Sequence, residues 1–137
     1  AQNFDADANL IVLRYADVLL MQAEAMNEQG YVADGPAFDK LNEVRDRAGL
    51  ADLTSADIPD QAVFRLAIEQ ERRIELSHEN HRWFDLIRTG RALEVMNVNN
   101  MSGSETYSVS SNQLLFPIPQ SEIDTNPGVL GQNPGYE

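Results

Sequence analysis

Three side chains in one segment have residue types and a spacing that could support chemistry. Glu71, Glu75 and His78 lie three or four residues apart within 57–79, where apolar residues recur with helical spacing. On a helix all three fall in one sector, which also holds the apolar residues Phe64, Ala67, Ile68 and Ile74. An unpaired carboxylate inside a protein is strongly destabilising, so it must be neutralised, paired or bound to a metal. Three interpretations of the segment follow.

The first interpretation is a metal site. Glu75 and His78 have the Glu-x-x-His spacing of di-iron carboxylate bundles, in which a second such motif and two more glutamates complete the ligand set. The other histidine, His81, has no glutamate three residues before it, and it lies one residue too close to His78 for a zinc-protease motif. The ligand set is incomplete, so we expect no metal and no other cofactor.

The second interpretation is a catalytic pair, and the third is a structural ion network. Glu71 and Glu75, one helical turn apart, could act as two carboxylates with separated pKa values. Alternatively, arginines could bind the inward-facing acids and fix how the helices dock. Charge favours the network, since residues 60–91 hold six acids and six bases and nine of the ten bases in the chain are arginine. The predicted network consists of Arg45, Arg47, Glu71, Arg72, Glu75, Arg82, Asp85 and Arg88, with Arg73 and Glu79 as further candidates.

A loop is the better candidate for ligand binding. Residues 97–113 are rich in Asn and Ser and have no apolar period. Amides and an aromatic ring suit hydroxyl-rich ligands, so we expect Asn99, Asn100 and Tyr107 to contact one, with an ordinary solvated loop as the alternative. Trp83 could stack on a sugar, but a lone Trp beside apolar neighbours on a helix is more typical of a core anchor.

Helices must position these side chains. Apolar periods predict helices over 10–29 and 36–48, joined by a short linker into a hairpin of the tetratricopeptide type. The wide apolar arc of the first helix predicts that neighbours cover most of its sides. Two further helices are expected over 57–79, capped by Asp57, and from 81 to 88 or 89, with a break at Asn80.

The predicted fold class is all-α, within a single domain over 1–137. Helices are expected in 1–96, a loop in 97–113 and an extended tail in 114–137. Four prolines in the tail are expected to prevent helix formation, with turns at 126–128 and 133–135.

The composition excludes several classes of protein. A chain of 137 residues suits one domain or a fragment of a larger one. Its 22 acidic and 10 basic residues give a net charge of −12, which would repel a phosphate backbone, so nucleic acid is not an expected partner. Without cysteine it has no disulfide or thiolate metal site, and no apolar run approaches the roughly 18 residues of a membrane span.

Four motifs, in order, resemble the SusD/RagB family of outer-membrane lipoproteins. The first is LRYADVLLMQAEA at 13–25, and the second is NEVRDRAGL at 42–50. The third is the long run ERRIELSHENHRWFDLIRTG at 71–90. The fourth is the ending, with FPIPQ at 116–120 and QNPGY at 132–136. Together the motifs extend over nearly the whole chain.

The resemblance implies a non-enzymatic protein that helps to capture oligosaccharides or other nutrients for a SusC-like TonB-dependent transporter. It implies a helical fold with tetratricopeptide-like hairpins, at the cell surface of a Gram-negative outer membrane. Family members are several times longer, so the match is to their C-terminal portion, and we expect the chain to be a fragment. The only expected membrane contact is a lipid anchor at an N-terminus outside the chain. No ligand-contacting residue is carried over from the family, because those residues vary among members.

A different class of protein remains open from the residues alone. A helical hairpin could be a general protein-interaction module that recognises a partner segment and binds no sugar. An upstream lipoprotein signal and a neighbouring transporter gene would favour nutrient uptake, whereas a cytoplasmic parent protein would favour the interaction module.

Overall fold

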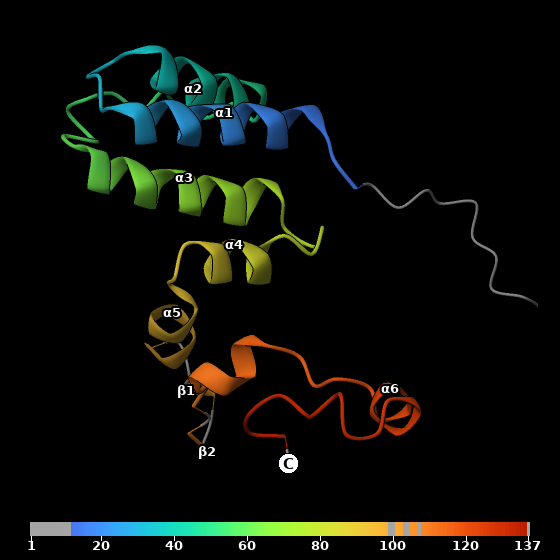
Figure 1. Ribbon diagram of the computed structural model, residues 1–137. Helices are drawn as coiled ribbons and strands as arrows, with labels where there is room; N and C mark the ends of the chain where they lie inside the picture. The colour runs from blue at the N-terminus through green and yellow to red at the C-terminus, as the bar shows by residue number, and fades with distance from the viewer. Residues whose placement is uncertain (1–11, 99–100, 103–104, 107, 137) are drawn as a thin grey trace, which may run out of the picture. The chain divides into compact units, whose positions relative to one another are not determined.

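The computed structural model describes residues 12–98, 101–102, 105–106 and 108–136 (Figure 1). The chain forms two compact units, Ala1–Arg82 and Trp83–Glu137. The predicted single domain therefore stays a prediction. Six α-helices, one 3-10 helix and two strands of two residues each lie in the described residues. The predicted all-α fold class is confirmed.

An antiparallel helical hairpin opens the first unit. Helices α1 (Tyr15–Gln29) and α2 (Pro36–Arg47) lie side by side, as predicted (Figure 1). Pro36 occupies the first position of α2, where its fixed φ suits a helix and its missing N–H is not needed. The helix ends in a Schellman motif at Gly49, whose φ is +71°, and the N–H of Leu50 donates to the carbonyl of Arg45 at 3.0 Å.

The sequence predicts that neighbours cover most sides of α1, and in the described part of the chain one face of this helix is exposed. Tyr15 is 67% exposed, and Val18 and Met21 are also exposed. On its other sides α1 packs mainly against α2 and α3 (Gln61–Glu75). An apolar arc wider than two neighbours can cover therefore leaves part of its surface in solvent.

Helix α3 begins and ends inside the bounds that the sequence predicts. Asp60, not Asp57, is the N-cap, and its Oδ1 accepts a hydrogen bond from the N–H of Val63 at 2.9 Å. The carboxylate of Asp57 is already used in a turn, where it accepts hydrogen bonds from the N–H and the hydroxyl of Thr54. The predicted cap is therefore wrong by three residues.

The early end of α3 has a conformational cause. His78 and Asn80 have φ values of +66° and +65°, in the left-handed region that L-residues other than glycine seldom occupy. The break predicted at Asn80 is confirmed, but the left-handed His78 moves the end of the helix back to Glu75.

The core of the first unit lies between α1, α2 and α3. Ile58, from the loop before α3, adds to it. The rings of Phe38 and Phe64 meet edge to face, with centroids 4.9 Å apart. The buried apolar set is Ala16, Leu19, Leu20, Ala23, Ala37, Phe38, Leu41, Val44, Ile58, Phe64 and Ile68. Removing these side chains from water is the main stabilising contribution, at about 25 cal/mol per Å² of apolar surface.

The second unit contains short elements. Helix α4 (Arg82–Arg88) begins at the last residue of the first unit, and α5 (Ala92–Val98) follows Gly90, whose φ is +71°. Strands β1 (Met101–Ser102) and β2 (Glu105–Thr106) form an antiparallel pair in the predicted loop. Leu86 and Ala92 are its buried apolar residues in the described part of the chain, whereas Trp83, the predicted core anchor, is half-buried.

The tail is partly helical. A 3-10 helix, η1 (Ser111–Leu114), precedes it, and α6 (Gln120–Thr125) fits between Pro119 and Pro127. The expectation that prolines prevent helix formation is wrong here, because six residues without proline are enough for one and a half turns. The two predicted turns are confirmed by hydrogen bonds from the N–H of Val129 to Asn126 and from the N–H of Tyr136 to Asn133.

Candidate functional site

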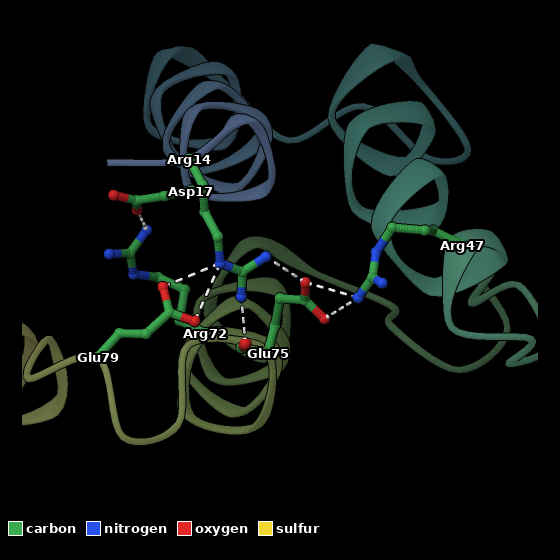
Figure 2. A network of polar contacts seen from close by, with 6 residues as sticks. All are labelled: Arg14, Asp17, Arg47, Arg72, Glu75 and Glu79. Carbon is green, nitrogen blue, oxygen red and sulfur yellow. Dashed lines mark hydrogen bonds and ion pairs between the residues drawn. The ribbon is translucent and has the colours of Figure 1, made fainter. Parts of the chain in front are cut away.

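Arg14 joins α1 to the C-terminal end of α3. Its Nε donates to both carboxylate oxygens of Glu79, at 3.0 and 2.9 Å, and its Nη1 donates to Oε1 of Glu75 at 2.6 Å. Its Nη2 donates to the main-chain carbonyl of Glu75. Figure 2 shows the guanidinium between these two glutamates. One side chain therefore holds both the last residue of α3 and the left-handed turn that follows it.

Two arginines of α2 bind the inward-facing glutamates of α3. Arg47 donates from Nη2 to both oxygens of Glu75 at 2.8 Å, on the side away from Arg14 (Figure 2). Arg45 donates from Nη1 to Glu71 at 2.9 Å and from Nε to the carbonyl of Ala51 at 3.0 Å. The Glu71 and Glu75 side chains are only 6% and 7% exposed, and each has a guanidinium partner.

A buried ion pair joins α1 to α3. Nη1 of Arg72 lies 2.6 Å from Oδ1 of Asp17, and both side chains are 5% exposed. Figure 2 places this pair beside the Arg14 cluster, with Asp17 on α1 and Arg72 on α3. A buried charge without its partner costs several kcal/mol, so this contact constrains how the two helices dock.

The pairing shifts the pKa values of two groups in the cluster. Hydrogen bonds to Glu79 and then to Glu75 raise the pKa of Arg14 above its ordinary value. The hydrogen bond from Arg14 lowers the pKa of Glu79 below its ordinary value of 4.5, because it stabilises the charged carboxylate. Both groups are therefore held in the charged form at neutral pH.

The structure brings together most members of the predicted network, in several separate pairs. Arg82 contacts Glu69 at 3.1 Å, a pairing that the sequence does not predict. Arg88 contacts Asp85 at 2.9 Å, three residues earlier in α4, so this pair stays within one helix. Arg73 is exposed and forms no ion pair with any described residue. The role of these residues as a structural network stays a proposal.

Sequence reasoning missed Arg14 and Asp17, which lie 55 to 65 residues from their partners. Two signals could have found them. Arg14 is the single basic residue before Lys40, and Asp17 is the single acid in the first half of α1. Arg72 follows the inward-facing Glu71 directly, so it needs an acid from another helix.

Neither a metal site nor an open carboxylate pair appears among the described residues. No group of three or more His, Asp or Glu side chains within them is placed to hold a metal ion. Glu71 and Glu75 bind arginines, and His78, placed by the sequence in their sector, is exposed. Ile74, predicted to face the core, is 58% exposed because the buried face is centred on Phe64, Ile68 and Glu71, nearly a quarter of a turn away.

The predicted ligand-contacting residues Asn99, Asn100 and Tyr107 lie outside the described residues. The neighbouring Asn97 is described, and its amide is paired with the main chain of Val109. Its Nδ2 donates to the Val109 carbonyl at 3.1 Å, and its Oδ1 accepts from the Val109 N–H at 2.7 Å. This side chain connects the two ends of the predicted loop.

The sequence matches the model of the SusD family over residues 2–136. The chain belongs to the SusD family. A SusD-like protein, P38, from Formosa agariphila is 35% identical over 95% of the chain. Surface glycan-binding protein A from Bacteroides thetaiotaomicron has a similar structure, with a TM-score of 0.77 and 37% identity over 95% of the chain. A laminarin-binding SusD-like protein gives a TM-score of 0.63 and 35% identity over 91%.

This SusD-family chain spans about a quarter of the length of these relatives. It covers 25% of P38, 26% of the surface glycan-binding protein and 23% of the laminarin-binding protein. The predicted family is confirmed, and so is the match to one portion of longer proteins.

Proposed function

We propose that this chain is part of a glycan-binding protein of the SusD family, without enzymatic activity. The observation that carries the proposal is the likeness to two solved relatives, one described as surface glycan-binding and one as laminarin-binding. Identity of 37% and 35% with these proteins supports a shared function as well as a shared fold.

In this proposal the arginine–carboxylate contacts are structural. Glu71 and Glu75 are occupied by guanidinium groups, so neither offers a free carboxylate for acid–base chemistry. The contacts join α1 and α2 to α3, and they fix how these three helices of the first unit dock. Asn99, Asn100 and Tyr107 are proposed to contact the glycan, because their amides and aromatic ring suit hydroxyl-rich ligands.

The proposed partner is a SusC-like TonB-dependent transporter, with the protein at the surface of the outer membrane. No helix in the described part of the chain is both long enough and apolar enough to cross a membrane. The proposed membrane attachment is a lipid anchor outside this chain, and the proposed ligand is an oligosaccharide.

Affinity electrophoresis of the full-length protein tests the function. In gels that contain individual neutral polysaccharides, laminarin among them, we expect at least one to retard the protein. We also expect no release of reducing ends from that polysaccharide over many hours. Tyr107→Ala should weaken the retardation, with Tyr136→Phe, which loses a hydroxyl bonded to the Leu115 carbonyl, as the control. No retardation by any polysaccharide, or steady hydrolysis of one, would overturn the proposal.

A further inference from the structure

A groove lies between the first turns of α1 and the last turns of α2. Its volume is about 410 Å³, within the range of roughly 300 to 1,000 Å³ that is typical of small-molecule sites. The groove is lined by Arg14, Tyr15, Ala16, Leu19, Glu43, Val44 and Arg47. We refer to it as the Tyr15 groove. All of its lining residues belong to the first unit.

The bottom of the Tyr15 groove is apolar and its edges are polar. Ala16, Leu19 and Val44 are core residues, so the apolar bottom of the groove is fixed in place by the packing beneath it. Tyr15, Glu43 and Arg47 remain accessible to solvent around them. This combination of an apolar surface with a few placed polar groups is typical of ligand sites.

Tyr15 supplies an aromatic face. Its side chain is 67% exposed, whereas other apolar side chains of α1, such as Leu19 and Leu20, are buried. The ring is restrained by its hydroxyl, which donates a hydrogen bond to Oε1 of Glu43 at 3.2 Å. A restrained ring loses less conformational entropy on binding than a free one, and an exposed ring can stack on the C–H face of a pyranose.

Arg47 and Glu43 supply hydrogen-bonding groups of both kinds. The Nη2 of Arg47 binds Glu75, while its Nε and Nη1 form no hydrogen bond with any described residue. Glu43 accepts hydrogen bonds from Tyr15 and from Lys40, and a carboxylate has room for further donors. Sugar hydroxyls both donate and accept, so they match this pair of side chains.

The charges around the groove favour a neutral ligand. Arg14 and Arg47 are matched by Glu75 and Glu79, and Glu43 is matched by Lys40 at 3.1 Å. Three acids therefore balance three bases. A charged ligand would lose its hydration on binding and would find no unpaired opposite charge among the described residues of the groove to compensate. The net charge of −12 further disfavours an anion.

We propose that the Tyr15 groove is a subsite for a neutral, hydroxyl-rich sugar unit, with Tyr15 as the stacking surface and Arg47 and Glu43 as the hydroxyl partners. This inference rests on the proposed glycan-binding function. It assigns glycan contact to the helical hairpin, in addition to the proposed loop residues.

Binding by the full-length protein and its variants tests the subsite. The probes are laminarin and the other neutral polysaccharides of the electrophoresis panel, with polygalacturonate as an anionic comparison. Tyr15→Ala should weaken binding of the preferred neutral glycan by about tenfold, because it removes the stacking face. Tyr15→Phe keeps the ring and should weaken binding by less. Val18→Ala, an exposed position of α1 outside the groove, is the matched control and should bind like wild type.

Hydroxyl-radical footprinting places the ligand directly. With saturating neutral glycan, we expect oxidation of Tyr15 to fall severalfold while oxidation of Met21, an exposed residue outside the groove, stays constant. Circular dichroism checks that each variant keeps the helical content of wild type.

The failure of the subsite is distinguishable from the failure of the proposed function. If wild type binds glycan, Tyr107→Ala weakens binding, and Tyr15→Ala has no effect with Tyr15 unprotected, only the subsite is overturned. Preferred binding of polygalacturonate through Tyr15 would overturn the neutral ligand class. If footprinting in the presence of the transporter protects Tyr15 and footprinting with glycan does not, the groove belongs to a protein partner and the subsite is overturned. Absence of binding to every glycan overturns both proposals.

Discussion

The helices of the first unit and the C-terminal tail are each stabilised by a different kind of polar contact. In the helices of the first unit, the polar contacts around α3 are largely between guanidinium and carboxylate groups, beside a core of apolar side chains. In the tail, side-chain amides bind the main chain. Gln132 accepts from the N–H of Ile118 at 2.7 Å and donates to the carbonyl of the same residue at 2.9 Å. Asn133 donates to the carbonyl of Phe116 at 2.7 Å.

The charge distribution explains the difference. Residues 92–137 have five acids and no base, so the tail cannot form ion pairs within itself. Paired amides need no counter-charge, and Gln132 completes the hydrogen bonds of a main-chain segment between Pro117 and Pro119. Stability that rests on charge should respond to pH and to charge removal, whereas stability that rests on amides should respond to steric changes.

The largest expected effect is the loss of the buried ion pair in the first unit. Asp17→Ala should lower the free energy of unfolding by about 3 to 5 kcal/mol, because it removes the carboxylate from the buried Arg72 guanidinium. Urea denaturation followed by circular dichroism measures the change. Glu28→Ala is the control, since its pair with Arg65 is about half exposed and should matter much less. Equal effects of the two variants would contradict the comparison.

A steric change in the tail should destabilise the protein less than the loss of the buried ion pair. A methyl group added at Gly135 would lie 2.8 Å from Nδ2 and 2.9 Å from Cβ of Asn112, at a φ of +88°. Gly135→Ala should therefore destabilise the tail locally by about 1 to 2 kcal/mol, seen as faster hydrogen exchange at the N–H of Tyr136 and Ile118. Gly128→Ala is the matched control, because its φ is +76° with no atom within 4 Å, so it incurs the backbone cost alone. Unchanged exchange at the N–H of Tyr136 and Ile118, or a change of exchange throughout α1 and α3, would contradict a local effect in the tail.

The smallest expected effect is a pH dependence in the first unit. Bonds to Arg14 lower the pKa of Glu79, and bonds to Ser55 lower that of Asp34. A carboxyl with a lowered folded-state pKa contributes fully above its ordinary value, here 4.5 for Glu79, and this contribution is lost as pH falls toward the folded-state pKa. The difference in melting temperature between wild type and Glu79→Gln should therefore shrink as the pH falls below about 4.5. A difference that stays constant down to pH 3 would argue against the Arg14 contact.

Local patterns predicted the helices better than they predicted the contacts between them. The hairpin, the break at Asn80 and the turns of the tail depend on neighbouring residues, and the structure confirms them. The cap of α3 was misplaced because Asp57 and Asp60 are both competent caps, and only the turn at Thr54 decides between them. The four prolines of the tail predict no helix there, but α6 forms in a stretch that contains none of them.

The candidate site was predictable in kind but not in its partners. Apolar periodicity showed that Glu71 and Glu75 face inward, and charge balance indicated arginine as their partner. Arg14 and Asp17 come from a helix more than fifty residues earlier, so the docking of α1 on α3, which helical periodicity does not encode, decides their contacts. The same docking leaves Tyr15 exposed at the groove.

A double-mutant cycle on Arg45 and Glu71 tests most directly the claim that inward-facing charges are paired and structural. Unfolding free energies of wild type, Arg45→Met, Glu71→Leu and the double variant give the coupling between the two side chains, which lie 2.9 Å apart. We expect each single variant to be destabilised. The double variant should lose about 1 to 3 kcal/mol less unfolding free energy than the sum of the two single losses, and this difference is the coupling. A coupling below about 0.5 kcal/mol, with single variants close to wild type, would contradict the account.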